Sequence, residues 1–212
     1  MEIIETITKK IDGKTKYNFV DEECKYLSNK WFDDVYDFEK DGYFIVKLEE
    51  KYTIFNAFNK TLCEQWFDEF LGFHNNPTSW AKKVDYSSVR IGDKWNYIDT
   101  NGNILFPNKW FDKALFFNDG YARIKLNEKW NWIDTNGRYV SEQWFDWVDE
   151  FSEGFGCVSL NDKFNFIDEE GNILSEQWFD GHIGYFTNGV ALVRLGDKFC
   201  YIDINGKIIS EM

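Results

Sequence analysis

Apolar and polar residues alternate with a period of two along much of the chain, and this alternation predicts β-strands. In one stretch, Ala122, Ile124 and Leu126 alternate with basic residues, and Trp130 and Trp132 follow with the same spacing. Successive side chains of a strand point to opposite faces of a sheet. The stretch therefore predicts two strands joined by a two-residue connection.

A turn sequence, Asp-Thr-Asn-Gly, follows the second of these strands at residues 134–137. An aspartate at the first position of a turn accepts a hydrogen bond from the backbone two residues on, and a glycine at the fourth position adopts the left-handed conformation. Tyr139 and Val140 then begin a third predicted strand, so the unit is a three-stranded antiparallel meander. Related turns occur at Asp99–Gly102, Asp134–Gly137, Asp168–Gly171 and Asp203–Gly206.

The whole pattern is repeated six times. Six strings that begin with a lysine align with one another: KYNFVD from Lys16, KYTIFN from Lys51, KWNYID from Lys94, KWNWID from Lys129, KFNFID from Lys163 and KFCYID from Lys198. A second marker, Trp-Phe-Asp, recurs in step at Trp31, Trp66, Trp110, Trp144 and Trp178. Both markers are spaced by 34 or 35 residues except in one copy, where the interval is 43 or 44. Two markers that lengthen together indicate an array of six copies with one insertion.

The six copies are expected to form one domain, residues 1–212. Their approximate bounds are 1–35, 36–72, 80–113, 114–147, 148–181 and 182–212, and the insertion lies around residues 73–80. Each copy also contains a less regular segment from Trp-Phe-Asp to Phe-x-x-Gly, as at Phe117–Gly120. This segment is too short for a long helix, and we expect it to form a turn or one additional strand.

The repeated strings resemble a known family. The pattern Lys-Trp-x-aromatic-Ile-Asp-x-x-Gly is similar to the WG repeat, whose copies usually read Lys-Trp-Gly-Tyr-Ile-Asp, and it extends from about Ile3 to Ile209. The chain departs from the family at the glycine after the tryptophan, which is replaced by Asn18, Thr53, Asn96, Asn131, Asn165 and Cys200. The first two copies also lose the turn glycine, with Cys24 and Asn59 near its place. The resemblance implies a β-repeat protein of a family common in bacteria, and it brings no catalytic residues.

A single meander cannot bury both of its faces, so neighbouring copies are expected to stack and share a core. We interpret the recurring rings, such as those of Trp95, Trp130 and Trp132, as this core, because each large aromatic side chain buries roughly 150–250 Å². The resulting prediction is an all-β, open, twisted array of six meanders. The alternative is a closed six-bladed ring similar to a propeller, which is less favoured because propeller blades usually have four strands.

The net charge of −13 narrows the range of partners. An acidic chain repels phosphate backbones, and its lysines and arginines are scattered, so we expect no binding of nucleic acid. The chain has no apolar run of transmembrane length and no signal-peptide core, and its four cysteines lack a CxxC pairing. These features predict a cytoplasmic protein that does not enter a membrane.

The sequence contains no group of residues that is typical of a catalytic site or a metal-binding site. The two histidines, His74 and His182, fall in different copies, and neither lies at metal-ligand spacing from a cysteine or a carboxylate. The Asp-x-Asn-Gly turns lack the alternating ligands and the bidentate glutamate of an EF-hand. We therefore expect a protein that is not an enzyme and that uses no metal or cofactor.

An acidic, aromatic-rich surface on a rigid array predicts a non-catalytic scaffold for protein–protein interaction. The alternative is a carbohydrate-binding module, which a surplus of exposed tryptophans would favour. Self-association through the chain ends is a further expectation for an open array, because uncapped sheet edges pair with other chains. Loops added to rigid scaffolds tend to carry function. The candidate contact residues are therefore those of the insertion, His74, Asn75, Asn76 and Trp80, and the alternative is a neutral insertion without a role.

Overall fold

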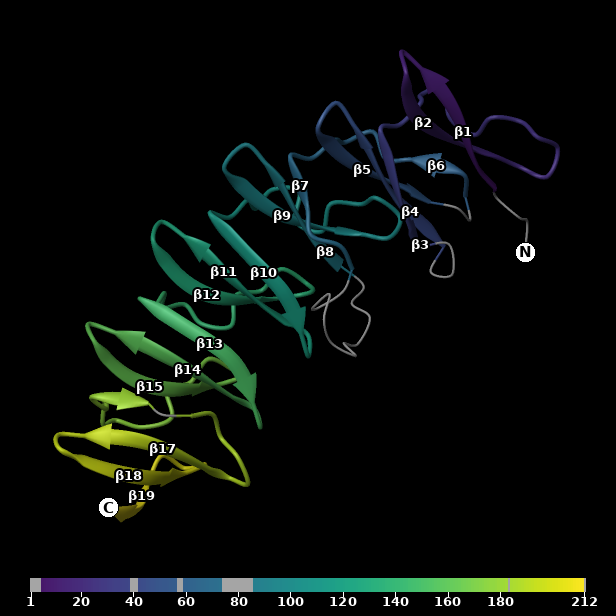
Figure 1. The fold of residues 1–212 in the computed structure, drawn as a ribbon. Coiled ribbons are helices and arrows are strands. Elements are labelled where there is room, and N and C mark those ends of the chain that lie inside the picture. The colour runs from purple at the N-terminus through teal and green to yellow at the C-terminus, as the bar shows by residue number, and fades with distance from the viewer. Residues whose placement is uncertain (1–4, 39–41, 57–58, 74–85, 183, 212) are drawn as a thin grey trace. The chain divides into compact units, whose positions relative to one another are not determined.

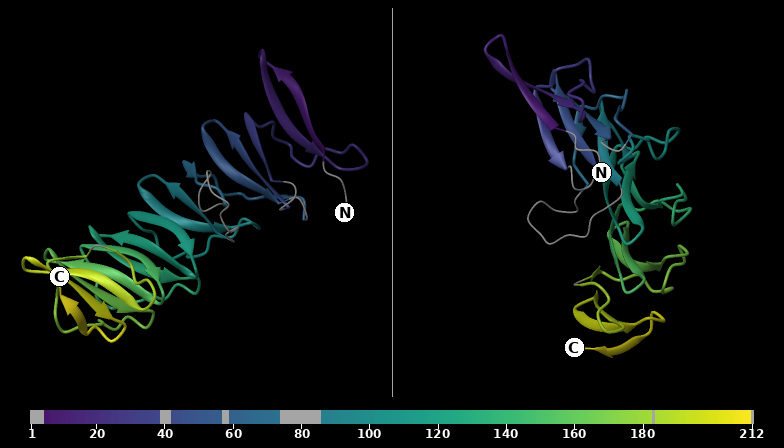
Figure 2. Two further views of the ribbon diagram at one scale, coloured as in Figure 1. Left: turned by 60° about the horizontal axis from the view of Figure 1, so that its bottom comes forward. Right: turned by 90° about the vertical axis from the view of Figure 1, so that its right-hand side faces the viewer.

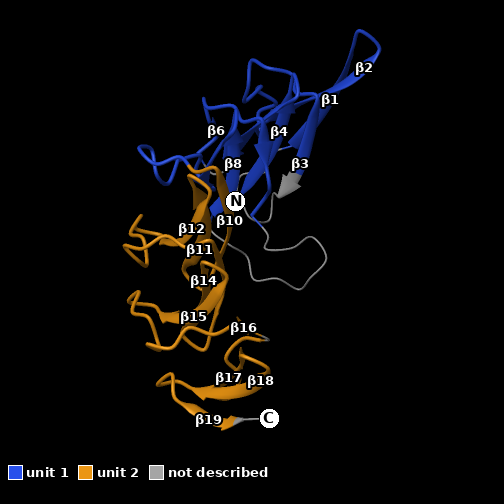
Figure 3. Ribbon diagram, turned by 90° about the vertical axis from the view of Figure 1, so that its left-hand side faces the viewer, with its two compact units in different colours: residues 1–110 blue, residues 111–212 orange. Residues whose placement is uncertain are grey.

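The computed structural model describes residues 5–38, 42–56, 59–73, 86–182 and 184–211. All regular secondary structure in this part of the chain is β-strand, and none of the sheets closes into a barrel. No helix among these residues is long and apolar enough to span a membrane. The chain divides into two compact units, residues 1–110 and 111–212 (Figure 3).

The first unit contains three antiparallel sheets. The first sheet pairs β1 (Glu5–Ile11) with β2 (Lys14–Val20). The second runs in the order β3 (Asp34–Phe38), β4 (Tyr43–Leu48), β5 (Lys51–Asn56) and β6 (Thr61–Leu62). The third runs in the order β7 (Glu69–Phe70), β8 (Tyr86–Ile91) and β9 (Lys94–Asp99).

The second unit also contains three antiparallel sheets. The fourth sheet of the chain is β10 (Lys113–Asn118), β11 (Tyr121–Leu126) and β12 (Lys129–Asp134). The fifth is β13 (Trp147–Ser152), β14 (Phe155–Leu160) and β15 (Lys163–Asp168). The sixth is β16 (Gly181–His182), β17 (Val190–Leu195), β18 (Lys198–Asp203) and β19 (Ile208–Glu211). Within each unit, consecutive sheets lie side by side in chain order, and the series does not close on itself (Figures 1 and 2).

Tandem antiparallel meanders are confirmed; the second and sixth sheets contain the three predicted strands and one more, whereas in the fourth and fifth sheets a different first strand takes the place of the predicted third. The irregular segment after Trp-Phe-Asp forms the first strand, as in β10, and the hairpin to β11 turns through Asp119 and Gly120, both with positive φ. A β-bulge between Ala114 and Phe117 hides this strand in the sequence, because a bulge interrupts the period of two. The predicted strand at Tyr139 makes only a single bridge, although β6 and β19 occupy the corresponding place in their sheets.

The core of the first unit lies between neighbouring sheets. Between the first and second sheets, the ring of Phe19 stacks on that of Phe55 and also contacts that of Phe44, with centroids 4.6 Å apart in both pairs. A separate cluster lies between the second and third sheets and includes Tyr43 and Val89. Each sheet is therefore stabilised by the next one, as expected for a repeat array.

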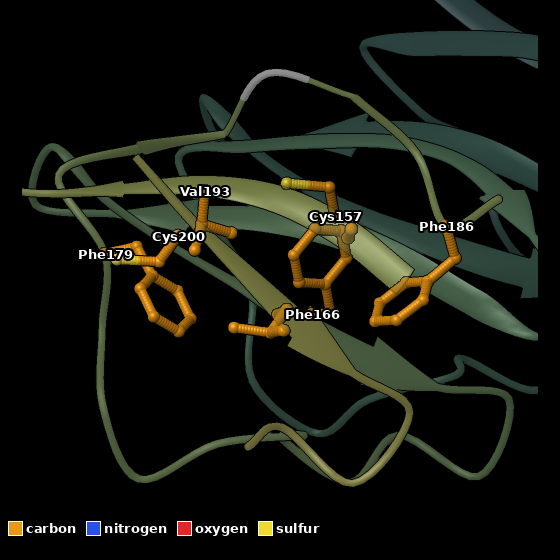
Figure 4. Close-up of a cluster of buried hydrophobic side chains, with 8 residues drawn as sticks. Cys157, Phe166, Phe179, Phe186, Val193 and Cys200 are labelled. Carbon is orange, nitrogen blue, oxygen red and sulfur yellow. The ribbon is translucent and has the colours of Figure 1, made fainter. Parts of the chain in front are cut away.

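The core of the second unit follows the same plan. Trp132 of the fourth sheet packs with Val158 of the fifth in one cluster. Figure 4 shows the next cluster, in which Phe166 of the fifth sheet meets Val193 and Cys200 of the sixth. Within each unit, a separate core between consecutive sheets makes stability a sum of neighbour contacts.

The rings that are fully buried differ from those expected. Trp132 is the only fully buried tryptophan in the described part of the chain, and Trp95 and Trp130 are half-buried. In every Trp-Phe-Asp marker the phenylalanine is fully buried and the tryptophan is half-buried. The buried members of this ladder are Phe32, Phe67, Phe111, Phe145 and Phe179. The half-buried members are Trp31, Trp66, Trp110, Trp144 and Trp178.

Candidate functional site

The aspartates of four Trp-Phe-Asp markers connect neighbouring copies. One carboxylate oxygen accepts a hydrogen bond from the lysine of the same copy, and the other accepts one from a backbone amide in a two-residue turn of the next copy, as Asp68 does from Lys51 (2.6 Å) and from the Gly92 amide (2.7 Å). The lysine and then the amide hold the pKa of each carboxyl below its usual value. We call Asp33, Asp68, Asp146 and Asp180 the marker aspartates. Their role is structural.

The aspartates of the Asp-x-x-Gly turns are engaged by their own backbone. Asp134 Oδ1 accepts hydrogen bonds from the amides of Asn136 (2.9 Å) and Arg138 (2.8 Å), and Asp99, Asp168 and Asp203 repeat this arrangement. The glycine is required at Gly171, where φ is +87° and a Cβ atom would lie 2.2 Å from the carbonyl oxygen of Val140 in the preceding copy. The turn interpretation is confirmed, and these turns form part of the stacking between copies.

Five of the six residues that replace the family glycine make side-chain hydrogen bonds to backbone carbonyl oxygens, and we call this arrangement a clasp. The side-chain amide of Asn131 donates hydrogen bonds to the carbonyl oxygens of Ser141 (2.8 Å) and Gln143 (3.3 Å), and its oxygen accepts one from the amide of Trp132 (2.8 Å). Asn18, Asn96 and Asn165 have the same role, and Thr53 donates its hydroxyl to the corresponding carbonyls. A buried polar side chain with these partners ties each meander to the segment that follows it.

Burial shifts the pKa of one histidine and one cysteine side chain among the described residues. His182 is half-buried between the rings of Trp147 (5.3 Å) and Phe164 (5.2 Å), and burial lowers the pKa of its imidazole. Burial raises the pKa of the Cys157 thiol well above its usual value. His74 lies outside the described residues. In the described ranges, no three His, Cys, Asp or Glu side chains are grouped as metal ligands.

A groove of about 400 Å³ lies between the second and third sheets. Its walls combine apolar and aromatic side chains with two carboxylates. The described residues that line it are Tyr36, Ile45, Tyr52, Asp68, Glu69, Phe70, Leu71 and Gly72. Tyr36 and Leu71 are 43% and 40% exposed, so apolar surface is accessible at this position. We call this feature the β7 groove.

The β7 groove lies where the repeat is interrupted. In the fourth and fifth sheets the first strand has six residues, whereas β7 has two and ends before Gly72, whose φ is +86°. The insertion that the sequence indicates begins directly afterwards. Because the first strand is cut short, it does not extend along the facing part of the second sheet, where Tyr36 and Ile45 form a cross-strand pair. The groove lies beside this short strand, but β16 at the fifth-to-sixth interface also has two residues, so strand length alone does not account for the groove.

The second unit shows how the same place is closed. Asp149 of β13 is the third residue after the aspartate of its Trp-Phe-Asp marker, as Tyr36 is in the second sheet, and the hydroxyl of Tyr185 in the next copy donates a hydrogen bond to it (2.9 Å). Ser152 also donates its hydroxyl to the carbonyl oxygen of Phe186 (2.9 Å). Polar contacts therefore join the fifth and sixth sheets at the position where the β7 groove is open.

Charge around the β7 groove is unevenly distributed. The two ionised side chains among its described lining residues are both carboxylates, Asp68 and Glu69. Lys51 and Arg90 hold them in place, the latter through a 3.0 Å contact to Glu69. Burial, and then the nearby carboxylate of Asp34, raise the pKa of Tyr36. The groove therefore presents an apolar surface beside two carboxylates that are each paired with a basic side chain, and we call Asp68 and Glu69 the acidic rim.

The sequence located the insertion but not the groove beside it. The candidate contact residues His74, Asn75, Asn76 and Trp80 lie outside the described residues, so their role as contacts stays a prediction. The groove residues Tyr36 and Leu71 were missed, because they lie 35 residues apart in the chain, beside different sheets that only folding brings together. The uneven interval between the markers was the one available signal.

Comparison with protein-family models gives one match. The model described as "WG containing repeat" matches residues 32–52, 97–130, 132–164 and 166–199, which is more than half of the chain. The resemblance seen in the sequence is thereby confirmed. A comparison with curated proteins finds no match.

Solved structures show only distant similarity. Hsv2 from Kluyveromyces lactis matches with a TM-score of 0.42 and 10% identity, over 81% of this chain and 60% of Hsv2, so the chain spans less than two thirds of that relative. A protein of unknown function from Bacteroides caccae matches with a TM-score of 0.29 and 16% identity, over 77% of this chain and 69% of that one. Dipeptidyl peptidase 4 from Porphyromonas gingivalis matches with a TM-score of 0.40 and 10% identity, over 99% and 44%. Similarity at this level says nothing about function.

Proposed function

Because this chain belongs to the family of proteins built from WG-containing repeats, we propose that it is a non-catalytic scaffold that binds a protein partner. The hydrogen bonds made by the recurring polar residues support this proposal. The marker aspartates, the turn aspartates and the buried asparagines are all engaged in hydrogen bonds within or between copies of the repeat. The chemistry of the recurring residues is thus structural, and any specific role has to come from a feature that breaks the repeat.

The observation that carries the proposal is the β7 groove. A contiguous apolar surface that stays exposed on a folded protein is often a site of interaction. Tyr36 and Leu71 supply such surface in a concave setting. The groove also lies at the base of the insertion, where added loops on rigid scaffolds tend to make contacts.

Carbohydrate binding remains the second candidate, and one observation favours it. The rings of Tyr36 and Tyr52 lie 6.5 Å apart beside two carboxylates, which is chemistry that also binds sugars. The abundance of tryptophan does not add to this case, because no tryptophan is among the exposed large side chains of the described residues. Binding to a glycan array that Tyr36→Ala abolishes would support the second candidate.

Affinity capture with the full chain tests the proposed function. The wild type and a Leu71→Asp variant are used in parallel on a lysate of the source organism, and bound proteins are identified by mass spectrometry. Leu71 is 40% exposed, so the substitution places a charge in the groove without burying it in a core. We expect a protein that the wild type retains and the variant loses. Identical sets from both would contradict the groove as the binding site.

A further inference from the structure

We propose that the β7 groove takes a segment of the partner in which a large aliphatic or aromatic side chain stands next to a lysine or arginine. This inference rests on the proposed function and specifies the chemistry of the partner. It follows from the two kinds of surface in the groove, an apolar seat and an acidic rim. Each kind selects a different part of the segment.

The apolar seat selects the large side chain. Ile45 is almost fully buried, and the partly buried Tyr52 and Phe70 stand with the more exposed Tyr36 and Leu71 around it. The volume of about 400 Å³ falls in the lower part of the range typical of ligand pockets. An aliphatic or aromatic side chain that enters the groove replaces water against these walls, which is the main source of affinity at such anchor sites.

The acidic rim selects the basic neighbour. Asp68 and Glu69 are the ionised groups among the described lining residues, and the chain as a whole carries a net charge of −13. A carboxylate has about four acceptor positions, whereas Asp68 accepts one bond at each oxygen and Glu69 accepts one from Arg90. Both carboxylates therefore retain acceptor capacity for an incoming ammonium or guanidinium group. The acidic chain also draws a basic partner toward it.

The ion pairs help to position the rim. Lys51 and the Gly92 amide fix Asp68, and Arg90 spans from β8 to Glu69 on β7. A carboxylate that is already oriented loses little conformational entropy on binding a cation. The rim is therefore a prepared acceptor surface beside the apolar seat.

Selection from a phage-displayed library of random peptides against the full chain tests this inference. We expect the enriched peptides to share a large apolar residue adjacent to lysine or arginine. Synthetic peptides of the enriched sequence should bind the Tyr36→Ala and Leu71→Asp variants at least tenfold more weakly. Glu69→Gln should weaken binding severalfold and should reduce its dependence on salt, because one charge of the rim is removed.

Tyr185→Ala is the matched control, because Tyr185 is an equally exposed tyrosine (47%) at the closed counterpart in the other unit. This variant should bind the peptides like the wild type. Enriched peptides that are acidic, or that lack an apolar residue, but still depend on Tyr36 would overturn the inference and leave the proposed function standing. Peptides that bind all variants equally would remove both. A gain in affinity on deleting residues 74–80 would assign the groove to the chain's own insertion and overturn the inference.

Discussion

The contact between Trp132 and Gly156 permits a direct test of how neighbouring copies hold each other. The indole of Trp132, on β12, covers the backbone of β14 at Gly156, and its Nε1–H donates a hydrogen bond to the carbonyl oxygen of Asp149 (3.0 Å). A Cβ atom at Gly156 would lie 2.7 Å from Cζ2 and 3.0 Å from Cη2 of the indole, and 3.3 Å from the ring of Phe151. The absence of a side chain at Gly156 is therefore what admits the indole.

The magnitudes follow from these distances. Gly156→Ala adds a methyl group where no space exists, and such overpacking costs about 1–3 kcal/mol. A gain of about 0.4–1 kcal/mol from the less flexible unfolded chain offsets part of it. We expect a net loss of about 1–2 kcal/mol. Trp132→Phe removes the atoms that clash together with the bond to Asp149, and it costs about 2 kcal/mol alone, of which the lost hydrogen bond supplies about 1.

The double variant tests whether the two losses of stability arise from the same contact. With phenylalanine at residue 132 the methyl group at residue 156 has room, so the second substitution should cost little and the two losses should not add. We expect a coupling free energy of about 1 kcal/mol or more in urea unfolding followed by circular dichroism. Trp132→Phe combined with Phe19→Leu, in a core cluster of the other unit, is the control and should be additive. Additivity within about 0.5 kcal/mol for the first pair would refute the reasoning.

Three further predictions concern single features of the repeat. Asn131→Gly, which restores the family residue, should destabilise the protein by about 1–3 kcal/mol because buried carbonyl oxygens such as that of Ser141 lose their donor. Faster amide hydrogen exchange around residues 141–143 would report this loss. An unchanged unfolding midpoint would contradict the role of the asparagine. The pKa of each marker aspartate is lower in the folded chain than the usual 3.8, so its contribution to stability is full above that value and is lost as the pH falls through the folded pKa. Urea midpoints measured from pH 6 to pH 3 should fall, and Asp146→Asn should flatten the fall; equal slopes for variant and wild type would exclude this role. Glu49 and Glu50 both have positive φ, a conformation that favours an Asn-Gly pair in such turns. Replacing them by Asn-Gly should therefore stabilise the protein by about 1 kcal/mol. A lowered thermal midpoint would show that the turn is unstrained.

The residues that were predicted well from the sequence are those whose structure depends on close neighbours in the chain. The two-residue turns and the Asp-x-x-Gly turns are local, because side chain, backbone and glycine conformation lie within five residues. The strand period and the repeat length can also be read directly from the order of residues. The sequence left the segment before the predicted meander open as a turn or an additional strand, and in β10 and β13 bulges between Ala114 and Phe117 and between Val148 and Phe151 shift the alternation that would have decided it.

The candidate site shows the opposite case. The spacing of the markers located the insertion, but nothing in the order of residues indicated that Tyr36 faces Leu71 across an open groove. The sequence also could not distinguish which ring of Trp-Phe-Asp is buried. Phe145 is fully buried and Trp144 is not, because the bridge to Trp130 turns the phenylalanine inward.

The sequence by itself determined the repeat, its all-β character, its turns and the place where the array is interrupted, because each of these depends on contacts within one copy. Only the tertiary structure decided which aromatic rings form the core, why glycine is needed at Gly156 and Gly171, and where apolar surface stays open. These features arise between copies, some 35 residues apart in the chain. Where two such surfaces pack together, each limits the side-chain volume and the hydrogen-bond partners available to the other. Neither limit can be read from the sequence of one copy.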